Sequence, residues 1–351
     1  MKKKVLALLI AASVFAAVSC SSTPVDDRES PPETKRTEEE TTTTEETTTE
    51  ETTTEETTTE ETTTTTSEET TVETSAQFEE ILELDFSYDT SDPVITSEED
   101  GIINIDFTRD GLCLSGRMYL PEGDGPYPTV IVATGLRVSC DEYEELAVNF
   151  AQEGIACVLF DFAGGPEGES HSDGEQLDMC LTSEVKDLNA VLDGVLTLDV
   201  VDTDNIFLFG HSFGGEVSTV VAAQRENDIN ALLLMEPAYL MSDMVAMFIP
   251  EGTEIPESVS YPYYLGHDFI AEMLIFDVYE YIPEFGGDVI LFSGTTADSL
   301  GLAYPQYYDE AEELFPSVTV VEVEGADHAF SGDAGYAMFD LAMEFINGEL
   351  V

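Results

Sequence analysis

The sequence predicts an α/β fold with a mostly parallel sheet, and three observations lead to it. From residue 101 to residue 346, strand patterns and helix patterns alternate, as expected when helices connect parallel strands. Several strands are continuous apolar runs, which is typical of strands that helices cover on both faces. The chain has 351 residues and 42% hydrophobic residues, which suffices for a large core.

The elements follow in chain order. Ile102–Phe107 and Leu112–Leu120 read as an opening β-hairpin, with Asp110-Gly111 as its turn. Two buried apolar strands are expected at Thr129–Ala133 and Ile155–Phe160, and four further strands at Asn205–Phe209, Ala231–Met235, Val289–Phe292 and Val318–Val323. Helices are expected at Tyr143–Glu153, Leu181–Leu196, Ser212–Arg225, Tyr307–Leu314 and Gly335–Ile346. The expected architecture is a sheet of eight strands flanked by helices.

The first 75 residues differ in kind from the rest. Residues 1–20 have three lysines, an apolar stretch and a small-residue site that ends at Cys20, as in a bacterial lipoprotein signal. We expect Cys20 to be lipidated, although an ordinary secretory signal is the alternative. Residues 21–75 are rich in Thr and Glu without apolar periodicity, which predicts a disordered tether. Residues 76–351 form the expected folded domain. This arrangement predicts a cell-surface protein anchored by its lipid, or a secreted one.

The charge of the chain excludes several partners. Lys and Arg number 11 and Asp and Glu 74, for a net charge of −63. Residues 76–351 hold 56 acidic and five basic residues. Nucleic-acid binding and docking on anionic lipid need basic residues, so neither is expected. The acidity suggests adaptation to a salty or ion-rich exterior, or selection for solubility.

Cysteine spacing indicates neither a metal site nor a cofactor. Cys113, Cys140, Cys157 and Cys180 match no metal-binding motif, and we expect them to be free thiols. No metal or cofactor is therefore predicted.

An insert interrupts the alternation between the sixth and seventh strands, at residues 236–287. It is rich in aromatic residues and methionines. We interpret it as a lid over a pocket, although it could also be a satellite core under a long excursion.

The chemistry is expected at Gly210-His211-Ser212-Phe213-Gly214, which joins a strand to a helix. In that context the pattern is typical of a nucleophilic serine on a strained turn. Ser212 is the predicted nucleophile. The side chain of His211 should point away from the hydroxyl.

A nucleophilic serine needs a base, and the base needs an acid to orient it. The chain has four histidines, and only His328 follows the last strand, where this order of residues requires the base. Asp298, after the penultimate strand, is the predicted acid. Glu236, after the Ala231–Met235 strand, is the alternative, because it could reach the same histidine.

An oxyanion hole needs two N–H donors. The backbone of Phe213, directly after the nucleophile, is one candidate. The other is the backbone of Leu136, in the loop after Thr129–Ala133.

These residues resemble the α/β-hydrolase superfamily, and within it bacterial esterases of the cinnamoyl and feruloyl type. Further resemblance lies in Asp161-Phe162-Ala163-Gly164-Gly165, in Ser172-Asp173-Gly174 and in the Gly-Ala-Asp-His stretch that ends at His328. Two departures occur: Thr134-Gly135 replaces the usual His-Gly, and Ser299–Leu302 replaces the usual run to Val-Pro. The resemblance implies an α/β-hydrolase fold whose insert forms the acyl pocket.

We therefore expect an extracellular serine esterase that acts through an acyl-enzyme. Its substrate would be a small or polysaccharide-linked ester, such as a feruloyl or acetyl ester of plant polysaccharide. A serine peptidase or thioesterase on the same site is an alternative. A non-catalytic surface binding module is another, although it would not need Ser212, Asp298 and His328 in this order.

Overall fold

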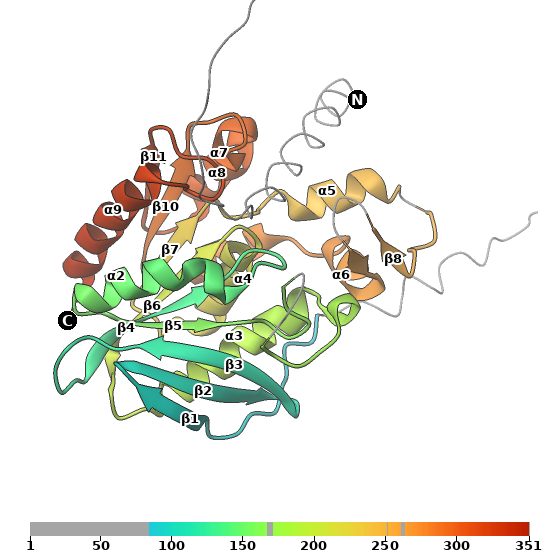
Figure 1. Cartoon of the computed structure of the whole chain (residues 1–351). Helices are drawn as coiled ribbons and strands as arrows, with labels where there is room; N and C mark the ends of the chain where they lie inside the picture. The colour runs from blue at the N-terminus through green and yellow to red at the C-terminus, as the bar shows by residue number, and fades with distance from the viewer. Residues whose placement is uncertain (1–83, 167–170, 251, 261–263, 351) are drawn as a thin grey trace, which may run out of the picture. The chain divides into compact units, whose positions relative to one another are not determined.

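The computed structural model describes residues 84–166, 171–250, 252–260 and 264–350. The predicted signal, Cys20 and the predicted tether lie outside the described residues. The described chain belongs to one compact unit built on a nine-stranded sheet of order β1-β2-β3-β5-β4-β6-β7-β10-β11 (Figure 1). Strands β4, β5, β6, β7, β10 and β11 run parallel, and β1, β2 and β3 are antiparallel to their neighbours.

The strands of the sheet are β1 (Val94–Glu99), β2 (Ile102–Arg109), β3 (Leu112–Tyr119), β4 (Tyr127–Ala133), β5 (Ala156–Phe160), β6 (Val201–His211), β7 (Ala231–Met235), β10 (Asp288–Gly294) and β11 (Val318–Val323). The α-helices outside the insert are α2 (Glu144–Gln152), α3 (Leu181–Val195), α4 (Phe213–Gln224), α7 (Leu300–Ala303), α8 (Pro305–Leu314) and α9 (Asp333–Glu349). Two short 3-10 helices are η1 (Cys140–Tyr143) and η2 (Gln176–Asp178).

Helices cover both faces of the sheet, so the side chains of its strands pack into two hydrophobic cores, one on each face. Along β4, Ile131 and Ala133 pack with the core that α3 and α4 cover, whereas Val130 and Val132 pack with the core under α2 and α9. Successive side chains of a strand point to opposite faces, so a strand buried on both must be apolar throughout. This explains the continuous apolar runs, and the predicted α/β fold with a mostly parallel sheet is confirmed.

One strand of this sheet was not predicted, so the sheet has nine strands instead of eight. β1 pairs antiparallel with β2 at the edge of the sheet, and all six of its residues are exposed. An edge strand without a buried face needs no apolar alternation, so its sequence carried no strand pattern. The predicted hairpin that follows is present, with positive φ at Asp110 and Gly111 in its turn.

The insert between β7 and β10 folds into short elements. These are α5 (Met241–Phe248), β8 (Ser258–Val259), β9 (Leu265–Gly266), α6 (His267–Met273), η3 (Val278–Glu280) and η4 (Ile282–Glu284). α6 packs against α3 and α5 (Figure 1). Its Phe269 ring lies 5.2 Å, centroid to centroid, from the ring of Phe213 at the start of α4. The insert therefore contacts the residue that follows the predicted nucleophile.

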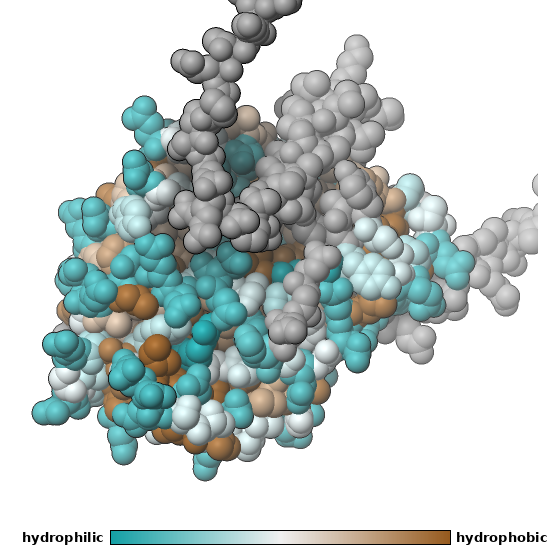
Figure 2. Space-filling model, viewed as in Figure 1, coloured by the Kyte–Doolittle hydropathy of each residue, from teal (hydrophilic) through white to brown (hydrophobic). Residues whose placement is uncertain are grey.

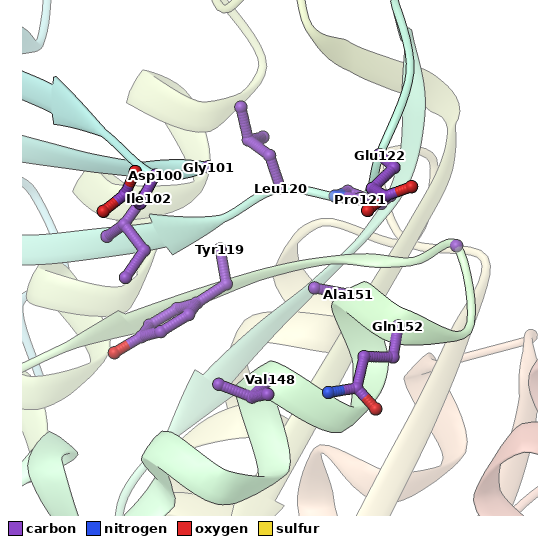
Figure 3. A pocket seen from close by; sticks show the side chains of 11 residues that line it. Asp100, Gly101, Ile102, Tyr119, Leu120, Pro121, Glu122, Val148, Ala151 and Gln152 are labelled. Atoms are coloured by element: carbon purple, nitrogen blue, oxygen red, sulfur yellow. The ribbon is translucent and has the colours of Figure 1, made fainter.

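A surface pocket of about 430 Å³ lies between α2 and the strands β2 and β3 (Figure 3). Val148, Ala151 and Gln152 of α2 face Ile102 and Tyr119 across it. These lining residues lie near the amino ends of the parallel strands, whereas the predicted catalytic residues follow their carboxyl ends. This pocket is therefore remote from Ser212.

Cys113, Cys140, Cys157 and Cys180 are free thiols, as expected. None of the described helices has the length and apolar character needed to span a membrane.

Candidate active site

Ser212 occupies a strained turn between β6 and α4. Its φ is 54° and its ψ is −119°, a backbone conformation that residues other than glycine rarely adopt. A Cβ atom at Gly214 would collide with the carbonyl oxygens of Ala133 and Thr134. One at Gly210 would lie 2.6 Å from a helix Cα atom. The two glycines thus let strand, turn and helix approach closely enough to present the serine hydroxyl.

The base predicted from chain order lies beside this hydroxyl. His328 Nε2 is 3.1 Å from Ser212 Oγ, within hydrogen-bond distance, although the residues are 116 positions apart. The imidazole is nearly buried, with 8% of the residue exposed. The structure therefore brings Ser212 and His328 together in the geometry that proton transfer from serine to imidazole requires.

The carboxylate beside this imidazole belongs to Glu236, not to Asp298. Glu236 Oε2 lies 3.6 Å from His328 Nδ1, and the glutamate is fully buried. Among the described residues, Asp298 has no ion pair or hydrogen bond with His328; its carboxylate instead accepts a hydrogen bond from Thr296 Oγ1. The structure thus brings the alternative acid, Glu236, and not Asp298 next to the base.

The sheet explains the position of Glu236. Strand β7 lies between β6 and β10, so the residue after β7 emerges next to the nucleophile. Glu236 Oε1 accepts hydrogen bonds of 2.6 Å from Gly294 N and from Ser299 Oγ, and Oε2 accepts one from Leu300 N. The end of β10, the loop after it and the start of α7 thus surround Glu236 and compensate its buried carboxylate, while Asp298 bonds within that loop.

At 3.6 Å the contact between Glu236 and Nδ1 is an ion-pair distance, and Nδ1 has no hydrogen bond within the described residues. Hydrogen bonds of catalytic groups are commonly long before substrate binds and tighten in the transition state. The site is therefore arranged so that the imidazolium, once formed, is stabilised by Glu236.

The predicted oxyanion donors flank the nucleophile. An added Cβ at Gly135 would lie 3.4 Å from Ser212 Cβ, so the loop after β4 touches the strained turn at Ser212, called the elbow below. Leu136 follows in this loop and is buried. Neither its N–H nor that of Phe213 donates to another described residue. Both amides are left to bind a developing oxyanion, and their roles stay predictions.

The other histidines lie elsewhere. His171 Nε2 is 3.5 Å from Asp141, and His267 Nδ1 is 3.1 Å from its neighbour Asp268; both imidazoles are at least two-fifths exposed. His211 is buried and bonds to Tyr143 and to the carbonyl of His328, so its side chain points away from Ser212 Oγ, as expected. The contact between Tyr143 and His211 was not predicted from the sequence, since 68 residues separate the two.

Within the part of the chain that the structure describes, no three His, Cys, Asp or Glu side chains form a metal-holding group. The chemistry this arrangement can perform is nucleophilic attack by a serine, with an imidazole as base and a carboxylate behind it.

The sheet order, the strained serine and the His–Glu pair define the class: the chain has the α/β-hydrolase fold. Residues 124–261 match the family model "Serine aminopeptidase, S33". This matched range includes the elbow and Glu236 but not His328. Among solved structures, Est1E from Butyrivibrio proteoclasticus with ferulic acid bound superposes with a TM-score of 0.59. It shares 20% identity and covers 68% of this chain and 96% of its own.

Curated relatives match a shorter segment. Monoglyceride lipase of Mus musculus is 32% identical over 136 residues, which is 37% of this chain and 41% of the lipase. Esterase FrsA of Escherichia coli O157:H7 is 29% identical over 136 residues, 38% of this chain and 31% of that esterase. The chain thus covers about two fifths or less of the length of these two relatives.

Proposed function

We propose that this chain is a serine esterase that hydrolyses carboxylic esters through an acyl-enzyme. The observation that carries the proposal is the 3.1 Å contact between Ser212 Oγ and His328 Nε2 at a strained elbow. Ser212 attacks the ester carbonyl while His328 takes its proton. His328 then protonates the leaving alcohol, and water hydrolyses the acyl-enzyme with the same base.

In this mechanism Glu236 orients the imidazole and stabilises its positive charge. The amides of Leu136 and Phe213 stabilise the oxyanion; one such donor typically contributes about 100–1000-fold in rate. The similarity to a lipase and an esterase supports ester hydrolysis over the matched segment.

The composition of the insert and the predicted N-terminal segments support a substrate class and a location. An aromatic, methionine-rich insert that packs on Phe213 suits an aromatic or medium-length acyl group. A lipidated Cys20 and a Thr/Glu-rich tether would hold the enzyme outside the cell, where substrates too large to import are found. We therefore propose feruloyl or acetyl esters of plant polysaccharide as substrates, hydrolysed at the cell surface.

The test is hydrolysis of nitrophenyl acetate, nitrophenyl butyrate, nitrophenyl laurate and methyl ferulate by the full chain, with Ser212→Ala as the matched control. We expect turnover by the wild type and a loss of at least about 1000-fold in the variant. Preference for methyl ferulate would support the feruloyl proposal. Inactivity of both proteins at low and high salt would contradict the esterase proposal.

A peptidase is the second candidate, because the matched family model is named for a serine aminopeptidase. The same triad can cleave an amide, but the substrate amine must then be bound. Hydrolysis of aminoacyl nitroanilides at a higher kcat/KM than the esters would favour this candidate.

A further inference from the structure

We propose that Tyr143 and His211 are positioning residues that hold the oxyanion loop, Thr134–Arg137, in register with the base His328. This inference rests on the proposed serine-hydrolase function and deepens it. Neither residue contacts the reacting atoms, so neither is a catalytic residue. The two side chains form a buried polar connection, named here the Tyr143–His211 bridge.

The bridge is a continuous run of hydrogen bonds. Gly135 N donates to Tyr143 Oη at 3.4 Å, Tyr143 Oη and His211 Nδ1 are 2.5 Å apart, and His211 Nε2 is 2.9 Å from the carbonyl oxygen of His328. Because that carbonyl can only accept, Nε2 must carry the proton of His211. Nδ1 therefore accepts from the tyrosine hydroxyl, and each group of the bridge has a partner.

Both side chains of the bridge are buried, with 7% of Tyr143 and 6% of His211 exposed. The His211 ring centroid lies 5.0 Å from that of His328. Burial, with the nearby His328 imidazole as a smaller cause, lowers the pKa of His211 to about 3. His211 thus stays neutral while His328 takes the serine proton, and it adds no positive charge beside the imidazolium.

The topology explains why a bridge is needed. The oxyanion loop follows β4 and His328 follows β11, and β6, β7 and β10 lie between those strands in the sheet. No sheet hydrogen bond therefore fixes one loop relative to the other. The reaction needs both at once, because the base and the oxyanion donors act on the same tetrahedral intermediate. A misplacement of about 1 Å can cost about 100-fold in rate.

Three variants of the full chain test the bridge. Tyr143→Phe removes the hydroxyl, His211→Leu removes both ring nitrogens, and His211→Gln keeps a donor for the carbonyl and an acceptor for the tyrosine. Tyr88→Phe is the matched control, since it also removes one tyrosine hydroxyl hydrogen bond, to Asp193 near the far end of α3.

With nitrophenyl butyrate, we expect Tyr143→Phe to lower kcat about 5–30-fold and His211→Leu about 100-fold, with KM within twofold. His211→Gln should recover most of the loss, and Tyr88→Phe should match the wild type. A boronic acid that forms a tetrahedral serine adduct is the second readout. Its inhibition constant should rise in parallel with the loss in kcat/KM, which a purely structural defect would not cause among folded molecules.

The far-UV circular dichroism of Tyr143→Phe and His211→Gln must match that of the wild type, and His211→Leu is included where it folds. The proposed bridge is overturned if all of these variants keep kcat and the boronate inhibition constant within twofold of the wild type. It is also overturned if His211→Gln loses as much as His211→Leu. An inactive wild-type chain would overturn the proposed function as well, whereas an active wild type with unchanged variants overturns the bridge alone.

Discussion

The carboxylate of Glu236 is fully buried and lies 3.6 Å from His328 Nδ1. It accepts hydrogen bonds from Gly294 at the end of β10 and from Ser299 in the loop that follows. Its φ of 48° shows a strained backbone directly after β7. A buried carboxylate with this many donors around it is rigidly held, which suits an orienting role behind a histidine.

We predict that Glu236→Gln lowers kcat about 1000–10,000-fold, because the amide holds the wrong imidazole tautomer and cannot stabilise the imidazolium. Asp298→Asn is the matched control and should stay within about threefold of the wild type. Steady-state ester hydrolysis measures both. Glu236→Asp, which keeps the charge, should retain more activity than the glutamine variant.

The opposite order of effects, with Asp298→Asn the damaging change, would show that the acid is Asp298 and that Glu236 is structural. The far-UV circular dichroism of each variant should match the wild type, so that loss of activity is not loss of folding.

At the scale of elements, a buried contact ties the insert to the body of the fold. The Glu272 carboxylate of α6 accepts a 2.9 Å hydrogen bond from Thr182 N, in the first turn of α3, and a second from Thr182 Oγ1. It thus satisfies a free amide of a helix N-terminus, where a negative charge is also favoured. Glu272 therefore ties α6 to the first turn of α3.

Glu272→Ala is expected to loosen the insert. Loss of a capping carboxylate typically costs about 1 kcal/mol, so cleavage within residues 236–287 by a dilute protease should accelerate. KM for laurate esters should rise more than KM for acetate esters, since only the long chain needs the insert. Asp268→Asn, on the exposed side of the same helix, should change neither; equal protease resistance in both variants contradicts the expectation.

A second feature at this scale is a pair of buried acids on neighbouring helices, Glu184 on α3 and Glu216 on α4. Burial, with further contributions from Asp187 and Glu216, raises the pKa of Glu184 well above its usual value. Burial alone does the same for Glu216. Among the described residues, neither Glu216 oxygen has a hydrogen-bond partner. Both carboxyls are therefore more readily kept neutral in the folded than in the unfolded chain.

This pair predicts that stability falls as pH rises. Above the unfolded pKa of about 4.3, the folded chain binds more protons at these groups than the unfolded chain, so the free energy of unfolding decreases with pH. Glu216→Gln cannot ionise and should flatten this decrease between pH 5 and pH 8 in urea titrations. Glu226→Gln, at an exposed site beyond α4, should leave the slope unchanged; an unaltered slope in Glu216→Gln would falsify the interpretation.

At the scale of the whole molecule, the acidic charge opposes compaction. Residues 76–351 hold 56 acidic and five basic residues. The face in Figure 2 is mostly hydrophilic, with scattered apolar patches. Like charges on a compact body repel one another more than on an expanded chain, and salt screens this repulsion.

We predict that the full chain becomes more stable when sodium chloride is raised from about 50 mM to about 1 M, since the Debye length then falls from above 10 Å to about 3 Å. The urea midpoint should shift upward with an unchanged m-value. A midpoint that is constant or lower in high salt would show that surface repulsion is not a major part of the stability of this protein.

Local pattern in the sequence determined the fold class and predicted two of the three residues that the structure brings together at the candidate site. Strands buried on both faces must be apolar throughout, and the elbow needs glycines around its serine. Both features can therefore be recognised from a few neighbouring residues. His328 followed from chain order among only four histidines. Only the tertiary structure shows that Glu236 and not Asp298 lies beside His328, because both follow neighbouring strands and only the path of the chain after β10 separates them. It also decided β1, which has no buried face, and the Tyr143–His211 bridge, whose partners are far apart in sequence and meet only through packing.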